Sequence, residues 1–381
     1  MKKRKVKKLP FVILLVLICG IFGSLYIFRG YFEKDNGDDN NPDVLEKDEP
    51  KAKEYTTSFT LGGNVLINSN MWYDTLTDTG YEFDNVFEDL NDIMKKSDVN
   101  FYFEQSMVGG KDLGLSFNYS YNSPTEIVTS LSKLGFNAMS LASYHSYDKG
   151  IAGIKNAVQT VVDNKFIYAG VNDTEENRLK INIIEKNGIK IALLSYTTGT
   201  DEIVQNPFAV DFYSDELVKN DVEKIKNEVD VIMVSIDWSD IKSGEVTEEQ
   251  KRIANYLADL GVNIVVGNTG YTIQPIEIIG ETFVCYSLGN LLSGHIVIDS
   301  RISAMVDFNL KITESSTEKK ISFENINVLF TYAYNADSRD YKVIPFTKLT
   351  NELVNYKSYY EKYKTLLNIP DNKINFYSIG E

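Results

Sequence analysis

The chain has 381 residues, 43% of them hydrophobic, which is enough for one large α/β domain or two smaller ones. Its formal net charge is −15, and residues 1–29 carry seven basic residues and no acid, so the rest of the chain carries a net charge of −22. A region with this much negative charge repels nucleic acids, so nucleic-acid binding driven by the overall charge is excluded.

The N-terminus predicts a membrane anchor. Residues 1–8 form a basic segment, and residues 9–28 contain 20 consecutive uncharged residues. At about 1.5 Å per residue, such a helix spans the roughly 30 Å hydrocarbon core of a bilayer. The basic residues before it place the N-terminus in the cytoplasm, so we expect a single-pass protein of the cell membrane with an extracellular domain. A cleaved signal peptide is the alternative, but its apolar region is usually shorter, about 7–15 residues, and no small-x-small cleavage site follows here.

Residues 29–54 are polar, acidic and contain proline, which predicts a disordered linker between the anchor and the domain. The two cysteines cannot form a disulfide, because Cys19 lies in the apolar run and Cys285 lies in a predicted strand.

The rest of the chain alternates predicted strands and helices, which favours a layered α/β fold, a β-sandwich flanked by helices. The predicted strands cover residues 58–61, 99–103, 136–142, 166–169, 181–185, 189–196, 229–236, 262–266 and 282–286. The predicted helices cover residues 85–96, 124–134, 153–164, 247–260 and 349–367. Asn187-Gly188 predicts a hairpin turn, and Thr247 with Gln250 predicts a capping box. We assign residues 55–310 to the main domain and 311–381 to strands and an amphipathic helix packed on it.

Polar residues follow several of these strands, where α/β proteins build their sites. The loop Gly267-Asn268-Thr269-Gly270-Tyr271 contains no histidine, cysteine or carboxylate. The whole chain has only two histidines, His145 and His295.

Seven segments in order resemble those of the CapA-type family, which is implicated in bacterial poly-γ-glutamate capsule synthesis. They are LGGNVLIN, YEFDNVFEDL, SDVNFYFE, LGFNAMSLASYHSYDKG, VDVIMVSIDWSD, GVNIVVGNTGYTIQPIE and VCYSLGN, within about residues 56–295. The resemblance implies a calcineurin-like, metallophosphatase-related fold. It also implies an envelope polymer, or the machinery that synthesises or exports it, as the partner.

The polar positions depart from the family pattern. Asn64 stands where the family has aspartate, and Tyr144 where it has the second asparagine of Asn-Asn-His. Asp237 replaces the histidine before Trp238, while Asn268 and Tyr271 replace the two outer histidines of Gly-His-His-Pro-His. A dinuclear site holds two cations about 3.5–4 Å apart and needs several anionic or imidazole ligands. We therefore expect no cofactor, and at most one divalent cation.

The resemblance nevertheless selects a set of candidate residues. The catalytic candidates are His145, Asp237 and Glu104, and the cleft candidates are Asn64, Tyr144, Asp148, Trp238, Tyr271 and Asn290. The ligands of a single Mg²⁺, Mn²⁺ or Ca²⁺ would be Asn64, Glu104, His145, Asp237 and Asn268. Purely structural roles compete with these assignments. Glu104, His145 and Asp148 would be a hydrogen-bonded group, Asp237 a turn cap and Asn64 a turn residue.

Three functions follow from these alternatives. The first is a membrane-anchored, catalytically degenerate CapA-like protein that serves capsule or envelope polymer synthesis or export. The second is an active metal-dependent hydrolase with a remade, oxygen-rich site. The third is a module that binds a glycan or another solute without chemistry.

Overall fold

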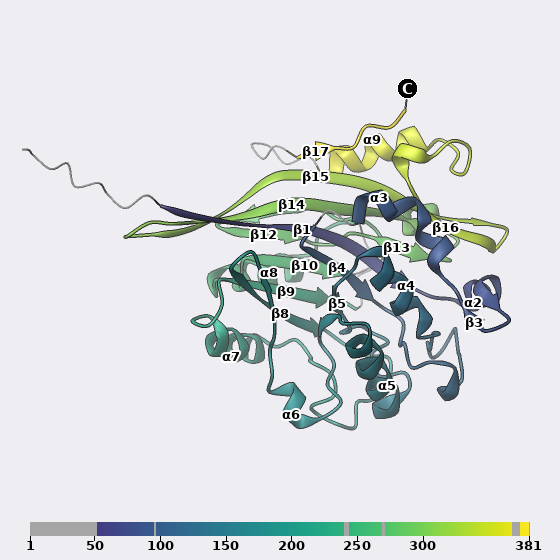
Figure 1. The fold of residues 1–381 in the computed structure, drawn as a ribbon, viewed down its shortest axis with the longest axis horizontal. Coiled ribbons are helices and arrows are strands. Elements are labelled where there is room, and N and C mark those ends of the chain that lie inside the picture. The colour runs from purple at the N-terminus through teal and green to yellow at the C-terminus, as the bar shows by residue number, and fades with distance from the viewer. Residues whose placement is uncertain (1–51, 95–96, 240–243, 269–270, 368–373, 381) are drawn as a thin grey trace, which may run out of the picture. The chain divides into compact units, whose positions relative to one another are not determined.

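The computed structural model describes residues 52–94, 97–239, 244–268, 271–367 and 374–380. The predicted anchor and most of the predicted linker lie outside these residues. Two sheets dominate the described part (Figure 1). The larger has the strand order β16-β15-β14-β1-β4-β5-β6, with β13 beside β1 and β17 beside β15. The smaller has the order β11-β12-β10-β9-β8-β7.

The strands of the larger sheet are β1 (Lys53–Leu66), β4 (Val99–Glu104), β5 (Ala138–Ser140), β6 (Ile167–Ala169), β13 (Asn290–Ser293), β14 (Ile302–Glu314), β15 (Lys319–Ala336), β16 (Arg339–Pro345) and β17 (Asn375–Phe376). Those of the smaller sheet are β7 (Asn182–Lys186), β8 (Ile189–Thr197), β9 (Val231–Asp237), β10 (Ile264–Asn268), β11 (Ile276–Ile279) and β12 (Thr282–Cys285). A separate two-stranded ribbon consists of β2 (Leu76–Thr77) and β3 (Gly80–Tyr81).

The two sheets pack face to face through a shared apolar core. Phe59 and Phe308 of the larger sheet stack with their ring centroids 5.2 Å apart. The ring centroid of Phe283, in the smaller sheet, lies 4.8 Å from that of Phe308. Their cluster also contains Met233 and Val266 from the smaller sheet. Because each strand alternates its side chains between two faces, the opposite faces of both sheets need helices to cover them.

Helices supply those outer layers. The helix α4 (Glu126–Leu134) and the helix α5 (Gly150–Asp163) contribute to a second core cluster with Tyr102 and Met139 of the larger sheet. The helix α7 (Asp215–Ile225) and the helix α8 (Glu248–Asp259) contribute to a third, on the smaller sheet. The predicted mixed α/β fold is therefore confirmed.

The shorter helices are α2 (Ser69–Thr75), α3 (Asn91–Met94) and α6 (Glu175–Arg178). The 3₁₀ helices are η1 (Asp84–Leu90), η2 (Lys111–Leu113), η3 (Ile298–Arg301) and η4 (Phe346–Lys348). Within the described residues, no helix is both long and apolar enough to cross a bilayer.

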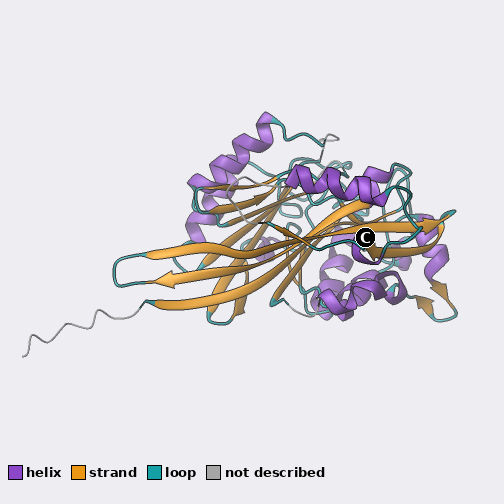
Figure 2. Ribbon diagram, turned by 90° about the horizontal axis from the view of Figure 1, so that it is seen from above, coloured by secondary structure: helices purple, strands orange, loops and turns teal. Residues whose placement is uncertain are grey.

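Long strands join the C-terminal region to the first strand. The strand β14 pairs with β1 from Lys53 to Leu61, and β15 pairs with β14. Figures 1 and 2 show these three strands extending to one side of the body. The helix α9 (Tyr356–Leu367) lies over β15 in Figure 1, and its Tyr360 ring is 5.7 Å from that of Phe330. Residues 302–345 thus belong to the same sheet as β1.

Three local predictions need correction. Residues 85–96 do not form one α-helix, because η1 precedes α3, and residues 95–96 lie outside the described part. The last helix begins at Tyr356 rather than at residue 349, since Asn355 adopts a left-handed φ of 61° that interrupts it. The helix α7 was not predicted, although Ser214 caps it and Val218, Val222 and Ile225 form its buried face.

Candidate functional site

Neighbouring strand ends of the smaller sheet place three polar residues side by side. Asp237, at the end of β9, pairs in register with Thr197 of β8 and with Asn268 of β10. These strands are parallel, so their carboxyl ends lie at one edge of the sheet. Thr197 was not among the predicted site residues. Its signal was a run of polar residues directly after the apolar strand of residues 189–196.

Asp237 is a fully buried carboxylate in this row. It accepts a hydrogen bond of 3.0 Å from Thr197 Oγ1, and the backbone amides of Ser239 and Tyr144 also donate to it. Burial raises its pKa from 3.8 to about 7, although these hydrogen bonds and nearby His145 partly oppose the rise. The loop that carries Tyr144 and His145 is therefore adjacent to the end of β9.

Asn268 is buried beside Asp237 without side-chain partners. Within the part of the chain that the structure describes, neither its amide oxygen nor its amide nitrogen has a hydrogen bond. Its backbone carbonyl accepts from the backbone amide of Trp238 at 2.9 Å. The indole of Trp238 is buried in the core on the helix side of the smaller sheet, and its Nε1 donates to Tyr286 O at 2.9 Å. Trp238 thus packs in the core beneath the strand end.

His145 belongs to an aromatic and acidic group in the loop after β5. Its Nδ1 lies 2.9 Å from Asp148 Oδ2, and its ring centroid lies 4.2 Å from that of Tyr121 and 5.4 Å from that of Tyr144. The backbone amide of Asp201 donates to Tyr144 O at 2.8 Å. The pKa of Tyr121 is raised to about 12, mainly by burial. The charges of surrounding groups, Asp148 and Asp201 among them, add to the rise.

Tyr271 links the two sides of the site. Burial raises the pKa of its phenol, and the negative charge of Asp237 adds to the rise. The side chain of Gln105 hydrogen-bonds to Tyr271, which partly opposes that rise. The ring of Tyr271 stacks on the ring of His295, with the two centroids 5.8 Å apart. Tyr271 therefore occupies space near Asp237 with a bulky aromatic side chain.

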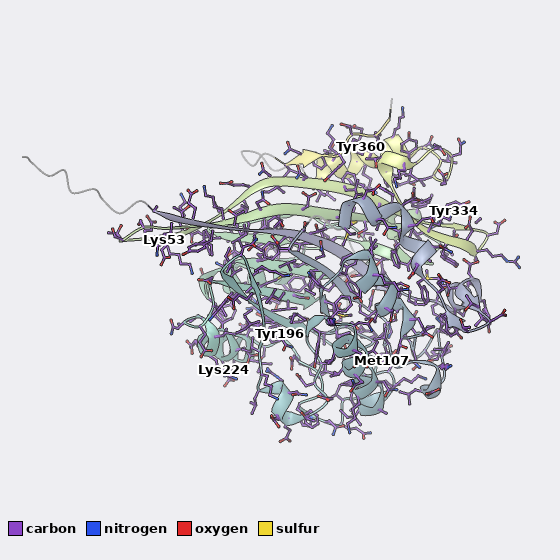
Figure 3. All side chains as sticks on the ribbon, in the orientation of Figure 1. Lys53, Met107, Tyr196, Lys224, Tyr334 and Tyr360 are labelled. Atoms are coloured by element: carbon purple, nitrogen blue, oxygen red, sulfur yellow. The ribbon has the colours of Figure 1, made fainter. Side chains whose placement is uncertain are left out.

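Glu104 ends β4, but its side chain faces the helices. Tyr102, two residues earlier on the same face, belongs to the cluster under α4 and α5. Glu104 lines a small cavity with residues of that cluster, including Met107, which is labelled in Figure 3. Ser106 Oγ donates to Glu104 Oε1 at 2.8 Å, whereas Oε2 has no partner. Burial raises the pKa of this carboxyl from 4.5 to about 8.

Asn64 and Asn290 form a hydrogen-bonded pair between β1 and β13. Asn64 Nδ2 donates to Asn290 Oδ1 at 3.0 Å, and Asn290 Nδ2 donates to Ser300 O at 2.7 Å. One hydrogen bond therefore joins the two amides and links β1 to β13.

The structure therefore groups the candidate residues unevenly. It joins Asp237 to Tyr144, His145 and Tyr271 through hydrogen bonds or charge interactions, and it places Asn268 beside Asp237 through the strand register. It pairs Asn64 with Asn290, and it turns Glu104 towards the helices. Sequence reasoning missed four residues that take part in these contacts: Gln105, Tyr121, Thr197 and Asp201.

These residues do not fit a pair of divalent cations. Asn64 and Asn268 bring only uncharged amide oxygens to such a site. Glu104 lines the cavity under the helices, which leaves Asp237 as the carboxyl of the strand-end row. Two adjacent cations repel one another unless anionic ligands offset that repulsion, and this set does not supply them.

Known proteins resemble the chain in sequence across the region that contains the site. The family described as "Bacterial capsule synthesis protein PGA_cap" matches residues 58–295. The "PGA biosynthesis protein CapA" of Bacillus subtilis is 25% identical over 277 residues, covering 69% of this chain and 70% of that protein. The "Capsule biosynthesis protein CapA" of Bacillus anthracis is 24% identical over 243 residues, covering 61% of this chain and 59% of that protein.

Solved structures resemble the chain more loosely. A putative 5′-nucleotidase from Staphylococcus aureus gives a TM-score of 0.43 at 11% identity, covering 81% of this chain and 58% of that one. A 5′-nucleotidase precursor from Thermus thermophilus gives 0.40 at 12% identity, covering 82% and 59%. These two likenesses are too loose to bear on fold or activity. The sequence match spans more than half of the chain and every candidate residue, so the chain belongs to the bacterial capsule synthesis protein family PGA_cap.

Proposed function

We propose that this chain serves the synthesis or export of a capsule-type envelope polymer, of the poly-γ-glutamate kind, outside the cell membrane. In this proposal residues 9–28 anchor it, and its scaffold derives from metallophosphatases but no longer holds two metal ions. The names of the two CapA relatives support the polymer class. The basic N-terminus and the uncharged run that follows it support the location.

One observation carries this proposal: the matched region contains the whole candidate site, but the strand-end row supplies only one carboxyl, Asp237, beside the uncharged amide of Asn268. Asn64 pairs with Asn290, and Asp237 is capped by Thr197 and two backbone amides. A hydrolase that activates water needs a charged base or a metal-bound hydroxide at neutral pH. In this candidate set Glu104 lines the cavity under the helices, so Asp237 and His145 are the candidates near the strand ends, which are few ligands for a metal-bound hydroxide.

Charge also bears on how the protein would act. Outside residues 1–29 the chain carries a net charge of −22, so a polyanion is repelled unless a local basic site receives it. We therefore infer that the chain supports the polymer machinery through contacts with other proteins rather than by holding the polymer along its surface.

A complementation experiment tests this role. A strain of the source bacterium that lacks the chain should lose its surface polymer, measured by composition analysis of extracted envelope material. The wild-type chain should restore the polymer, and so should Glu104→Gln and Asp237→Asn, provided that immunoblots show equal protein levels. A chain without residues 1–29 should not restore it.

Two results would replace the proposal. If both carboxyl variants are present at normal levels but fail to restore the polymer, and the purified wild-type chain hydrolyses a phosphate ester, the active-hydrolase alternative holds. If the purified chain binds the extracted polymer tightly and the polymer persists in its absence, the binding-module alternative holds.

A further inference from the structure

Three side chains that could ligate a cation converge beside the strand ends. One ligating atom from each of His145, Asp148 and Asp201 lies within 4.8 Å of the others. His145 and Asp148 come from the loop after β5, whereas Asp201 comes from the loop after β8 and is held there by its backbone hydrogen bond to Tyr144 O. Asp201 lies outside all seven segments of the family resemblance.

The buried carboxylate of this group, Asp148, has one oxygen without a partner among the described residues. The side chain of Asp148 is fully buried, and its Oδ2 is paired with His145 Nδ1 and with the backbone amide of Tyr121. Its Oδ1 is buried as well but has no hydrogen-bond partner in the described residues. Leaving a buried acceptor unpaired costs about 1–3 kcal/mol and more for a charged group, so such an atom indicates a partner that completes the site.

The lysine and arginine side chains of the described residues do not supply positive charge to this group. In the part of the chain that the structure describes, the only ion pair of Asp148 is with His145, and Asp201 has no ion pair with a lysine or an arginine. Tyr121 covers the ring of His145, which limits the access of water on that side. A hydrogen-bonded His145–Asp148 pair alone would leave Asp148 Oδ1 unexplained.

We propose that His145, Asp148 and Asp201 form a site for one divalent cation of the Mn²⁺ type. Carboxylates and one imidazole suit this ion, whereas Ca²⁺ and Mg²⁺ prefer oxygen ligands throughout. Asp201 is exposed, so its side chain can rotate to close the distance to the buried pair. The ligating nitrogen is Nδ1, which faces Asp148, so the ion replaces the Nδ1–Oδ2 hydrogen bond. Nδ1 must then carry no proton, which a neutral imidazole keeps on Nε2 and an imidazolium releases to solvent.

The proposed site differs from the ligand set that the sequence suggested. It uses His145 but neither Asn64, Glu104, Asp237 nor Asn268. The inference depends on the geometry of this cluster and not on the proposed role in polymer synthesis, so its failure would leave that role untouched.

Manganese binding to the full chain tests the site. The chain is purified in detergent without a polyhistidine tag and titrated with Mn²⁺ by calorimetry, with electron paramagnetic resonance to count bound ions. We expect one bound ion per chain. Asp201→Asn should weaken binding roughly tenfold or more, because it removes a ligand charge without disturbing the core. Asp148→Asn should weaken it as well, although this buried substitution also risks misfolding.

Matched variants distinguish this site from diffuse attraction to acidic surface and from an ion bound at the strand ends. Glu202→Gln removes the neighbouring exposed acid and should leave the affinity unchanged, and so should Asp237→Asn. The proposal is overturned if no stoichiometric ion binds, or if Asp201→Asn binds like the wild type. It is also overturned if Glu202→Gln weakens binding as much as Asp201→Asn, which would mean diffuse attraction. Weakening by Asp237→Asn alone would place the ion at the strand ends instead.

Discussion

Asn268, which replaces a family histidine, and Glu104, which the family pattern retains, both leave buried polar atoms unpaired among the described residues. The amide of Asn268 is buried with neither atom paired, and Glu104 leaves one carboxylate oxygen unpaired in a small cavity. Each unpaired buried group costs on the order of 1–3 kcal/mol. Glu104 reduces this cost by holding a proton, which its raised pKa of about 8 makes the favoured state at neutral pH.

Glu104→Gln should change how stability depends on pH. Burial raises the folded-state pKa of Glu104 from 4.5 to about 8, so its stabilising contribution is complete below pH 4.5 and is lost as the pH rises to about 8. At 1.36 kcal/mol per pKa step this loss is at most about 5 kcal/mol. Glutamine keeps an acceptor for Ser106 and carries no charge, so this variant should be more stable than the wild type at pH 9 and not at pH 5.

Urea denaturation at pH 5, 7 and 9 measures this difference. The exposed carboxylate variant Glu202→Gln serves as the control and should follow the wild type at each pH. A constant difference between Glu104→Gln and the wild type across the three values would contradict the buried-carboxyl assignment.

At the same scale, the motifs predicted residue positions better than side-chain directions. The resemblance placed Glu104 at a strand end beside Asp237. Strand alternation, however, sends its side chain to the face of Tyr102, under the helices. Asp201 carried no motif at all, because its place beside His145 depends on how the loop after β8 folds back onto Tyr144.

At the scale of elements, the predictions that succeeded rest on local chemistry. Thr247 and Gln250 form both hydrogen bonds of the predicted capping box at the start of α8. Asn187 and Gly188 both adopt positive φ, 52° and 80°, in the predicted hairpin between β7 and β8. The start of α9 and the 3₁₀ form of η1 escaped prediction, since tertiary packing rather than propensity sets such boundaries.

Gly267 in β10 lies where Trp238, after β9, and Tyr286, after β12, approach the strand closely. A Cβ added there would overlap Tyr286 O and the indole of Trp238, which are joined by a hydrogen bond of 2.9 Å. Gly267→Ala must therefore displace Trp238 or β12, and we expect a loss of about 1–3 kcal/mol or more of unfolding free energy. Gly244→Ala is the matched control, because among the described residues its Cβ would meet only Thr272 Oγ1, at 3.8 Å. Equal urea midpoints for the two variants would contradict this packing account.

At the scale of the whole molecule, the strands of residues 302–345 are part of the sandwich rather than an appendage. The strand β14 pairs with β1 along most of its length, and β15 and β16 continue the same sheet. Sequence patterns indicated strands here but not their partners, because pairing between residues about 250 positions apart leaves no local signal. Truncation before β14 would expose the edge of β1 and the aromatic core around Phe308.

Membrane topology is the prediction that concerns the whole chain. Six basic residues precede the uncharged run of residues 9–28, and an acidic segment follows it, a pattern that predicts residues 52–381 outside the cell. Protease added to intact, wall-stripped cells should therefore digest residues 52–381 while a cytoplasmic marker protein survives. The chain should stay with the membrane in alkaline carbonate and keep residues 1–8, as measured by mass spectrometry. Residues 52–381 that resist protease until the cells are lysed would overturn the orientation, and a mature chain without residues 1–28 would establish a cleaved signal peptide in place of the anchor.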